Sequence, residues 1–176
     1  MNKRTLMVGS IIFVALVLVV SIAAASSRFN VAGQYLLSEP FENVTATPHG
    51  ANCIIEADLT YPFLGDLVGE AKVHFRVLVH GPCEQADPFA FKETYWGEGT
   101  FTGEVMMGKD GTKAGTFDFD YKGKGWPAPI GEQAVQAQMR VISGTGELEN
   151  LHGKLDVTYI MGEAFDSYDG WLHFSN

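Results

Sequence analysis

The chain has 176 residues and a formal net charge of −9, with 12 basic residues against 21 acidic ones. A strongly acidic chain without a cluster of lysine and arginine is poorly suited to bind nucleic acid or anionic lipid. The length is sufficient for one domain with a hydrophobic core.

The N-terminal segment is typical of export. Lys3 and Arg4 precede an uncharged apolar run over residues 6–25, and this run ends in small residues before Ser26. Such a segment fits a signal peptide, and it is also long enough to cross a bilayer of about 30 Å as an uncleaved hydrophobic helix. Residues 1–25 are therefore a signal peptide or an N-terminal membrane anchor. In both cases residues 26–176 are expected outside the cytoplasm, secreted or held on the outer face of the cytoplasmic membrane.

The first residues after this segment carry few strand signals. Residues 26–33 are interpreted as a short tether, and residues 38–50, which include two prolines, are interpreted as an exposed loop. Asn43 begins an Asn-Val-Thr triplet, which is an N-glycosylation candidate in an exported chain.

Strands are predicted by alternation of apolar and polar residues. The clearest examples are residues 73–79, 117–121, 135–141, 155–161 and 168–174. A tight turn is predicted at residues 109–111 and a longer loop at residues 123–131, because glycine and proline gather there. No capped amphipathic helix is evident after residue 26. About eight short strands with little helix are typical of an antiparallel barrel or a sandwich.

A glycine followed by an acid and an aliphatic residue occurs three times. The three copies begin at Gly65, Gly103 and Gly146. A repeated phrase of this kind indicates one turn device used several times in a meandering sheet. The neighbouring acids are expected to shape these turns and to accept hydrogen bonds from exposed backbone N–H groups.

The order of the glycine-containing stretches at residues 64–70, 101–105, 115–117 and 143–153 resembles a family of small prokaryotic proteins. That family is known as a domain of unknown function, and its fold resembles the allene oxide cyclase barrel. The resemblance covers roughly residues 55–175. It implies an all-β, eight-stranded antiparallel barrel with a hydrophobic interior pocket, and it implies no activity. The leader, both cysteines and residues 125–131 depart from the family pattern, which indicates an exported specialisation.

Cys53 and Cys83 are the two cysteines of the chain. In an oxidising compartment they are expected to form one disulfide, with two separate buried thiols as the alternative. In the chain-entropy model this bond stabilises the fold by roughly 3.5 kcal/mol.

Neither a metal site nor a cofactor is predicted. His74 and His80 share one face of a strand but lie about 20 Å apart, which is too far for one metal ion. The five histidines are therefore interpreted as solvated strand residues. The chain also lacks a nucleophile elbow.

The aromatic and aliphatic side chains on the inward faces are candidates to line a ligand pocket, although core packing is their more frequent use. The pocket candidates are Phe75, Val77, Phe117, Phe119, Tyr121, Met139 and Tyr159. Glu93 is the candidate catalytic residue, because an acid surrounded by aromatic residues can act as a general acid or base. Of its two registers, the one that places Glu93 at the surface is favoured.

Three functions are consistent with these features. The first is non-enzymatic binding of a small apolar ligand by an exported barrel. The second is a cofactor-independent isomerase or cyclase, which rests on fold analogy. The third is a structural protein of the cell surface, anchored through residues 6–25 or assembled as a homo-oligomer through strand edges.

Overall fold

The computed structural model describes residues 28–36, 38–84 and 90–175. These residues form nine β-strands and one short 3₁₀ turn, and they contain no α-helix. The strands are β1 (Phe29–Tyr35), β2 (Ser38–His49), β3 (Asn52–Gly65), β4 (Leu67–Val79), β5 (Glu93–Met106), β6 (Thr112–Gly125), β7 (Gln133–Gly146), β8 (Leu151–Ile160) and β9 (Asp166–Phe174). The fold is all-β, as the alternating pattern predicted.

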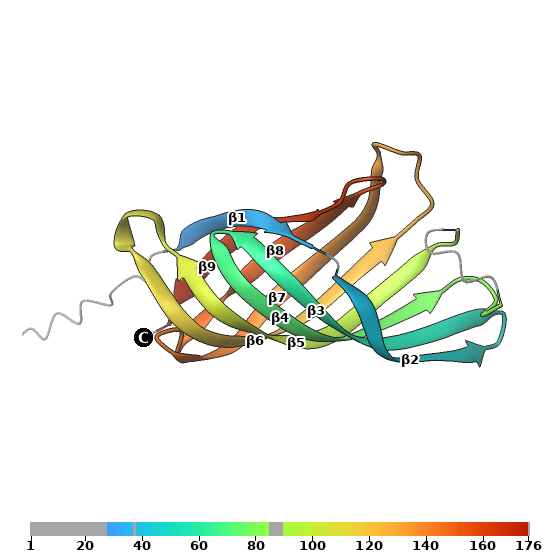
Figure 1. Ribbon diagram of the computed structural model, residues 1–176, viewed down its shortest axis with the longest axis horizontal. Helices are drawn as coiled ribbons and strands as arrows, with labels where there is room; N and C mark the ends of the chain where they lie inside the picture. The colour runs from blue at the N-terminus through green and yellow to red at the C-terminus, as the bar shows by residue number, and fades with distance from the viewer. Residues whose placement is uncertain (1–27, 37, 85–89, 176) are drawn as a thin grey trace, which may run out of the picture.

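The strands form one antiparallel sheet that curls into a barrel-like ring (Figure 1). Neighbours follow the order β1-β9-β8-β7-β6-β5-β4-β3-β2, and β1 also pairs with β3. This last pairing closes the ring through Gly33 opposite Gly65, Gln34 opposite Leu64 and Tyr35 opposite Phe63. β2 attaches to the remaining length of β3 and contributes the strand beyond the expected number of about eight.

β1 pairs with one end of β3 and β2 pairs with the other end, so the ring has two distinguishable halves. We call the half that contains the β1–β3 pairs the closed half, and the half in which β2 lines β3 the open half. The closed half contains the β3–β4, β5–β6 and β7–β8 connections. The open half contains the β4–β5, β6–β7 and β8–β9 connections, which reach the right of Figure 1.

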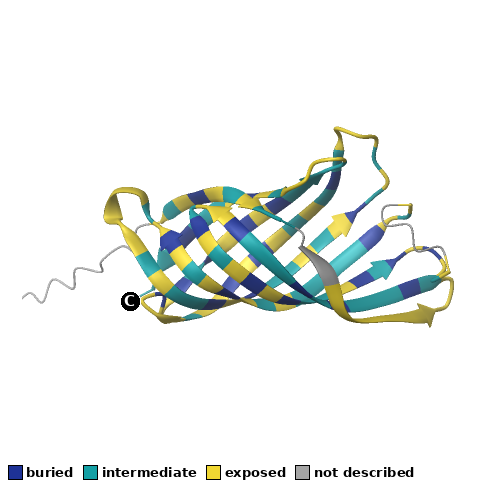
Figure 2. Cartoon of the chain, viewed as in Figure 1, coloured by how far each residue is buried: buried dark blue, intermediate teal, exposed yellow. Residues whose placement is uncertain are grey.

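The core lies inside the closed half. Buried and exposed residues alternate along the strands there (Figure 2), because successive side chains of a strand point to opposite faces. Phe101 and Leu155 are 0% exposed and Phe117 is 1% exposed. The rings of Phe101 and Phe117 stack at 4.7 Å between centroids, so aromatic packing fills this half.

Glycines make room for these rings. Gly69, Gly103, Gly115 and Gly146 form one row across β4 to β7. A Cβ at Gly103 would lie 2.2 Å from the backbone oxygen of Val68 and 2.9 Å from the ring of Phe101. The repeated phrase is therefore a turn in two copies, because Gly65 and Gly146 have φ of 108° and 67°. In the second copy it lies within β5, and the prediction of a third turn there is wrong.

The acids beside these glycines behave as the sequence suggested. Glu147 accepts a hydrogen bond from the Ala114 N–H at 3.0 Å, and Asp66 accepts one from the Ala32 N–H at 2.9 Å. Each carboxylate fastens a turn to the neighbouring strand.

Two predicted irregular segments are in fact strands. Residues 29–33 belong to β1 rather than to a tether, and residues 38–49 form β2 rather than a loop. Residues 41–49 of β2 are exposed, as expected. The predicted loop at 123–131 begins later, because β6 continues to Gly125.

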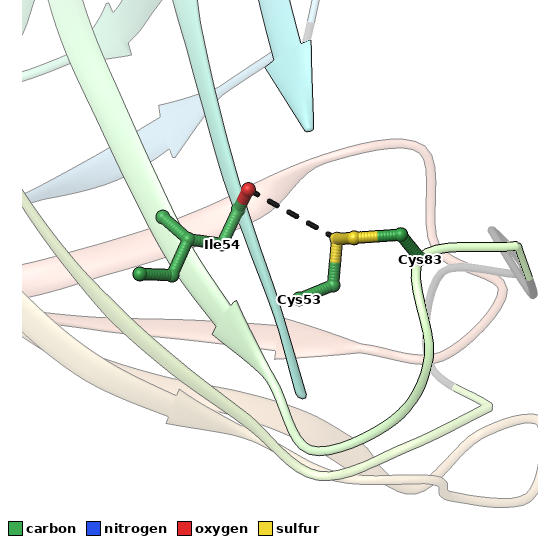
Figure 3. The surroundings of a disulfide bond; sticks show 3 residues. All are labelled: Cys53, Ile54 and Cys83. Atoms are coloured by element: carbon green, nitrogen blue, oxygen red, sulfur yellow. Dashed lines mark hydrogen bonds between the residues drawn. A yellow bond between two sulfur atoms is a disulfide. The ribbon is translucent and has the colours of Figure 1, made fainter. Parts of the chain in front are cut away.

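Cys53 and Cys83 form a disulfide, as predicted (Figure 3). The bond joins the start of β3 to the segment that follows β4, at the rim of the open half. Cys53 is 1% exposed and packs with Val77 and Val79.

The predicted leader at residues 1–25 lies outside the described residues. Among the residues that are described, none belongs to a helix of sufficient length and apolarity to span a membrane.

Candidate functional site

Solvent reaches side chains inside the open half of the ring. Strand pairing places Tyr61 on the same face as the buried Ala71 and Phe101, and it places Tyr121 on the same face as the buried Met139. These tyrosines therefore point inward, yet both are only partly buried. The same holds for Tyr35, Ile55, Phe75, Tyr95, Val135, Ala137, Tyr159 and Asp166. The closed half is packed, whereas these inward side chains of the open half keep partial exposure to solvent.

Several inward positions on β5 to β7 carry small residues, namely Gly97, Gly123, Gly125 and Ala137. The Tyr121 ring lies over Gly97, where a Cβ would be 2.7 Å from that ring. Tyr95 and Glu93 lie over Gly125 in the same way. Gly123 lies beside Ala137, and a Cβ at Gly123 would be 2.5 Å from the Cβ of Ala137. The small residues therefore make room for neighbouring inward side chains.

Aromatic rings lie where the interior of the open half meets the core of the closed half, and we call this layer the floor. Tyr35, Tyr61, Phe75 and Tyr121 pack against the buried core of the closed half. Tyr35 and Tyr61 meet edge to face with ring centroids 5.2 Å apart, and Tyr35 stacks on Phe63 at 5.1 Å. These contacts fix the positions of the rings.

Asp166 brings a carboxyl group to this floor. It is the first residue of β9, and it pairs with Tyr35 of β1. The Tyr35 hydroxyl donates a hydrogen bond to the carboxylate. Burial raises the pKa of Asp166 to about 6, and the hydrogen bond from Tyr35 opposes this rise.

The tyrosine hydroxyls are held in their neutral form. Burial raises the pKa of Tyr35 and of Tyr61 well above the ordinary value, and the nearby charge of Asp166 adds to both rises. Burial also raises the pKa of Tyr121, and the backbone of Arg76 offsets part of the effect. Even so, the Tyr121 hydroxyl is buried and has no hydrogen-bond partner of good geometry in the described part of the chain.

Glu93 lies inside the ring rather than at the surface. It is 7% exposed, and the Tyr95 hydroxyl donates a hydrogen bond to its carboxylate. The favoured surface register is therefore wrong. The reason lies in the pairing of Glu93 with Val79 and Gly125, which puts the acid on the inward face and gives it room over a glycine.

The predicted pocket residues all point inward, but they divide between the two halves. Phe117, Phe119 and Met139 are buried in the core of the closed half. Val77 is buried in the small cluster around Cys53. Phe75, Tyr121 and Tyr159 remain partly exposed in the open half. These three keep partial exposure to solvent, whereas the other four belong to buried clusters.

Sequence reasoning missed Tyr35, Tyr61 and Asp166. Tyr35 and Tyr61 belong to strands that carry weak alternation, and Asp166 precedes the pattern detected in residues 168–174. Residues two apart on a strand lie on the same face, so the alternation that placed Tyr168 inward also predicts an inward Asp166 if the strand is extended by two residues.

The outer face has a groove of about 410 Å³ between β2, β3 and β4. Its polar lining includes Asp58, which accepts hydrogen bonds from Asn43 at 2.6 Å and from His74 at 2.8 Å. These bonds, that from Asn43 first, lower the pKa of Asp58. Asn43, the glycosylation candidate, is exposed and has a left-handed backbone with φ of 52°. Asp58, His74 and Asn43 thus satisfy one another at this groove.

The histidines do not assemble a metal site. His74 pairs with Asp58, and His80 lies 3.4 Å from the Thr94 hydroxyl. Within the described residues, no group of three or more histidine, cysteine, aspartate and glutamate side chains has the arrangement to hold a metal ion.

Comparisons with known proteins bear on the fold. No family model matches the chain, and no curated protein matches it. Among solved structures, the chain is similar to a protein of unknown function from the DUF3224 family of Shewanella oneidensis MR-1. The TM-score is 0.62 at 18% identity, and the match covers 85% of this chain and 99% of the other. The resemblance to a small domain-of-unknown-function protein with a barrel-like fold is thereby confirmed.

Proposed function

We propose that this chain is a non-enzymatic binding protein that holds one small, largely apolar molecule inside the open half of an allene oxide cyclase-like barrel. The observation that carries the proposal is the contrast between the two halves. Inward side chains of the closed half are buried, whereas several inward side chains of the open half, Phe75, Tyr121 and Tyr159 among them, stay partly exposed. A pocket with an apolar lining and a few polar groups is the usual form of a small-molecule site.

The lining supports an apolar body for this ligand. Phe75 and Ile55 form one side, and Ala137 and Val135 form the other. Polar groups are few and lie at defined places, with Asp166 at the floor and Glu93 near the rim. Such an arrangement gives affinity through burial of apolar surface and orientation through hydrogen bonds.

Export is part of the proposal. The disulfide between Cys53 and Cys83 favours an oxidising compartment, which agrees with the apolar segment at residues 6–25. Residues 26–176 would then meet their ligand outside the cytoplasm, after secretion or from an anchored position.

A second function, a cofactor-independent isomerase or cyclase, is favoured by one observation. The carboxyl group of Asp166 lies in the accessible interior among tyrosines, with a pKa of about 6. This value suits a general acid or base near neutral pH. In this second proposal Asp166, rather than Glu93, is the candidate general acid or base.

The proposed binding function is tested by a substitution that places a large side chain inside the open half. Nile red, a neutral apolar dye, is titrated with the full chain, with Ala137→Phe and with Ala114→Phe. Ala137 faces the interior beside Gly123, whereas Ala114 is exposed on the outer face of β6. We expect the dye to bind wild type, Ala137→Phe to weaken binding at least tenfold, and Ala114→Phe to have no effect.

Equal dye affinity of all three proteins would show that the interior is not the site. Loss of dye binding in Ala137→Phe is informative if its circular dichroism spectrum and its thermal transition remain those of a folded sheet. A smaller interior substitution, Ala137→Leu, gives an intermediate loss if the space itself binds the dye.

A further inference from the structure

The open half of the ring has a one-sided charge. Its inward positions in the described strands include the acids Glu93 and Asp166 and no lysine, arginine or histidine. The basic residues of the neighbouring strands lie on the outer face, where Arg76 pairs with Glu56 and Arg140 pairs with Asp120. A ligand in this interior therefore meets negative charge alone.

Asp166 has polar neighbours but no positive partner. Tyr35 of β1 donates to it, and the hydroxyl of Tyr61 on β3 lies near enough for its pKa to respond to the Asp166 charge. No basic group in the described part of the chain contributes to the electrostatic environment of Asp166. Its carboxylate therefore gives up hydration without a compensating cation.

The faces of the aromatic rings add to this preference. Tyr35, Tyr61, Phe75 and Tyr121 line the floor beside Asp166. The face of an aromatic ring attracts cations, and groups of such rings recognise ammonium head groups. A carboxylate among aromatic rings is a combination that favours an organic cation over a neutral or anionic molecule.

We propose that the ligand of the open half is an amphiphilic organic cation, with an ammonium head group at Asp166 among Tyr35 and Tyr61 and an apolar body toward Phe75, Ile55 and Ala137. This inference rests on the proposed binding function and specifies the class of molecule bound. The head group supplies the positive charge that Asp166 lacks, and the body occupies the space beside Gly123 and Ala137.

The affinity for such a ligand depends on pH. Asp166 binds the cation in its charged form, and its pKa of about 6 means that this form predominates above that value. The other titratable side chains that face the interior are Glu93, Tyr35, Tyr61, Tyr95, Tyr121, Tyr159 and Tyr168. The raised pKa values of Tyr35, Tyr61, Tyr121 and Tyr168 keep these hydroxyls neutral. We expect the affinity to rise from pH 5 to pH 7 and then to level as Asp166 ionises.

The experiment compares three probes that share an eight-carbon chain. Octyltrimethylammonium, octanol and octanoate are titrated by calorimetry at pH 7.5 into the full chain, Asp166→Asn and Asp169→Asn. Asp169 lies on the same strand as Asp166 but is exposed on the other face, so it controls for the loss of one negative charge. We expect wild type to bind the ammonium probe at least tenfold more tightly than octanol, and octanoate most weakly.

Asp166→Asn should remove this tenfold preference, whereas Asp169→Asn should retain it. Binding of octanol that equals or exceeds binding of the ammonium probe to wild type overturns the cation inference and leaves the binding function intact. So does an unchanged preference in Asp166→Asn. If no probe binds and Nile red binding is also absent, the binding function itself fails.

The wild-type protein provides a second check that needs no variant. Octyltrimethylammonium has a permanent charge, so a rise of its affinity between pH 5 and pH 7 reports on the protein. An affinity that is flat over this range contradicts the role of Asp166.

Discussion

Asp166 shows how one residue acquires its properties from the strands around it. The β1–β9 pairing places it opposite Tyr35, and the curl of the sheet removes much of its hydration. Burial therefore favours the protonated acid and raises the pKa of Asp166 to about 6. The same residue on the outer face of β9 would titrate as an ordinary aspartate.

The pH dependence of the free energy of unfolding should report the raised pKa of Asp166 directly. The folded pKa of Asp166 exceeds the unfolded value of about 3.9, so the folded state holds its proton more tightly than the unfolded state. Its contribution to stability is thus fully present below about pH 4 and is lost as the pH rises through about 6. Asp166→Asn, which resembles the protonated acid, is expected to raise the free energy of unfolding by about 2 kcal/mol at pH 8 and to leave it nearly unchanged at pH 4.

Urea unfolding at the two pH values measures this difference, with Asp169→Asn as the matched control. The comparison with wild type cancels groups such as Asp58, whose lowered pKa acts in the opposite direction. A gain in stability of equal size at both pH values would mean that the effect comes from packing rather than from the proton.

Part of this candidate site could be predicted from the sequence. Phe75, Tyr121 and Tyr159 were named as candidates because they lie on alternating segments, and the structure places them on the inward face. Tyr35, Tyr61 and Asp166 were missed, since they meet only through pairings between strands far apart in the chain. Glu93 was assigned to the wrong face, because the order of residues alone does not fix which register a strand adopts.

At the level of elements, the three residue pairs between β1 and β3, which we call the seam, are supported by one side chain from a third strand. Tyr168 of β9 reaches across the interior, where its hydroxyl accepts a hydrogen bond from the Leu67 N–H at 2.8 Å and donates one to the Leu64 carbonyl at 3.2 Å. Gly33 permits this crossing, because a Cβ there would lie 2.4 Å from the Tyr168 hydroxyl. Burial raises the pKa of Tyr168 to about 12, so the hydroxyl stays neutral.

Removal of this hydroxyl should weaken the seam. Tyr168→Phe leaves the Leu67 N–H and the Leu64 carbonyl without their partner, and we expect a loss of about 2 kcal/mol in the free energy of unfolding. Tyr121→Phe is the matched control, because its buried hydroxyl has no hydrogen-bond partner of good geometry among the described residues. That variant should be neutral or slightly stabilised. Urea unfolding of both decides, and equal losses would contradict this explanation.

Prediction of the elements succeeded where one face of a strand is buried. Residues 73–79, 135–141 and 155–160 alternate because the core requires it, and all of them are strands. β2 was taken for a loop, since residues 41–49 are exposed on both faces and Pro48 interrupts the segment. Backbone pairing with β3, rather than a buried face, holds β2 in place, and the sequence pattern does not record such pairing.

At the level of the molecule, the two halves differ in the packing that protects the backbone. The closed half has the aromatic core and the β1–β3 pairs, whereas the open half ends in β2, which pairs with β3 alone among the described strands. Regions with few buried contacts open with lower free energy than a packed core.

Rates of amide hydrogen exchange should therefore differ between the closed half and the open half, even within one strand. Amides of residues 99–105 in β5 and 115–121 in β6 should exchange last, near the rate set by global unfolding. Amides of β2 should exchange at least a hundredfold faster, and the start of β5 should lie between. Exchange of β2 as slow as that of the β5 and β6 segments would show that the ring behaves as one unit.

The overall class followed from composition and period, but the closure did not. Many short alternating strands suit a sandwich as well as a barrel, and the three residue pairs between β1 and β3 distinguish them here. Each of these pairs joins residues more than 25 positions apart in the chain, so no local sequence pattern predicts it.

The short seam also bears on which molecules the chain can accommodate. In a ring whose strands are paired along their whole length, circumference is set by the number of strands and their stagger. Here that constraint applies to one end, because the chain leaves β9 after Tyr35 and follows β3 instead. The angle of β2 is therefore not fixed by a closed ring of hydrogen bonds at the open half. Under the proposed binding function, selectivity would then depend more on the charged group that a ligand presents to Asp166 than on the bulk of the ligand.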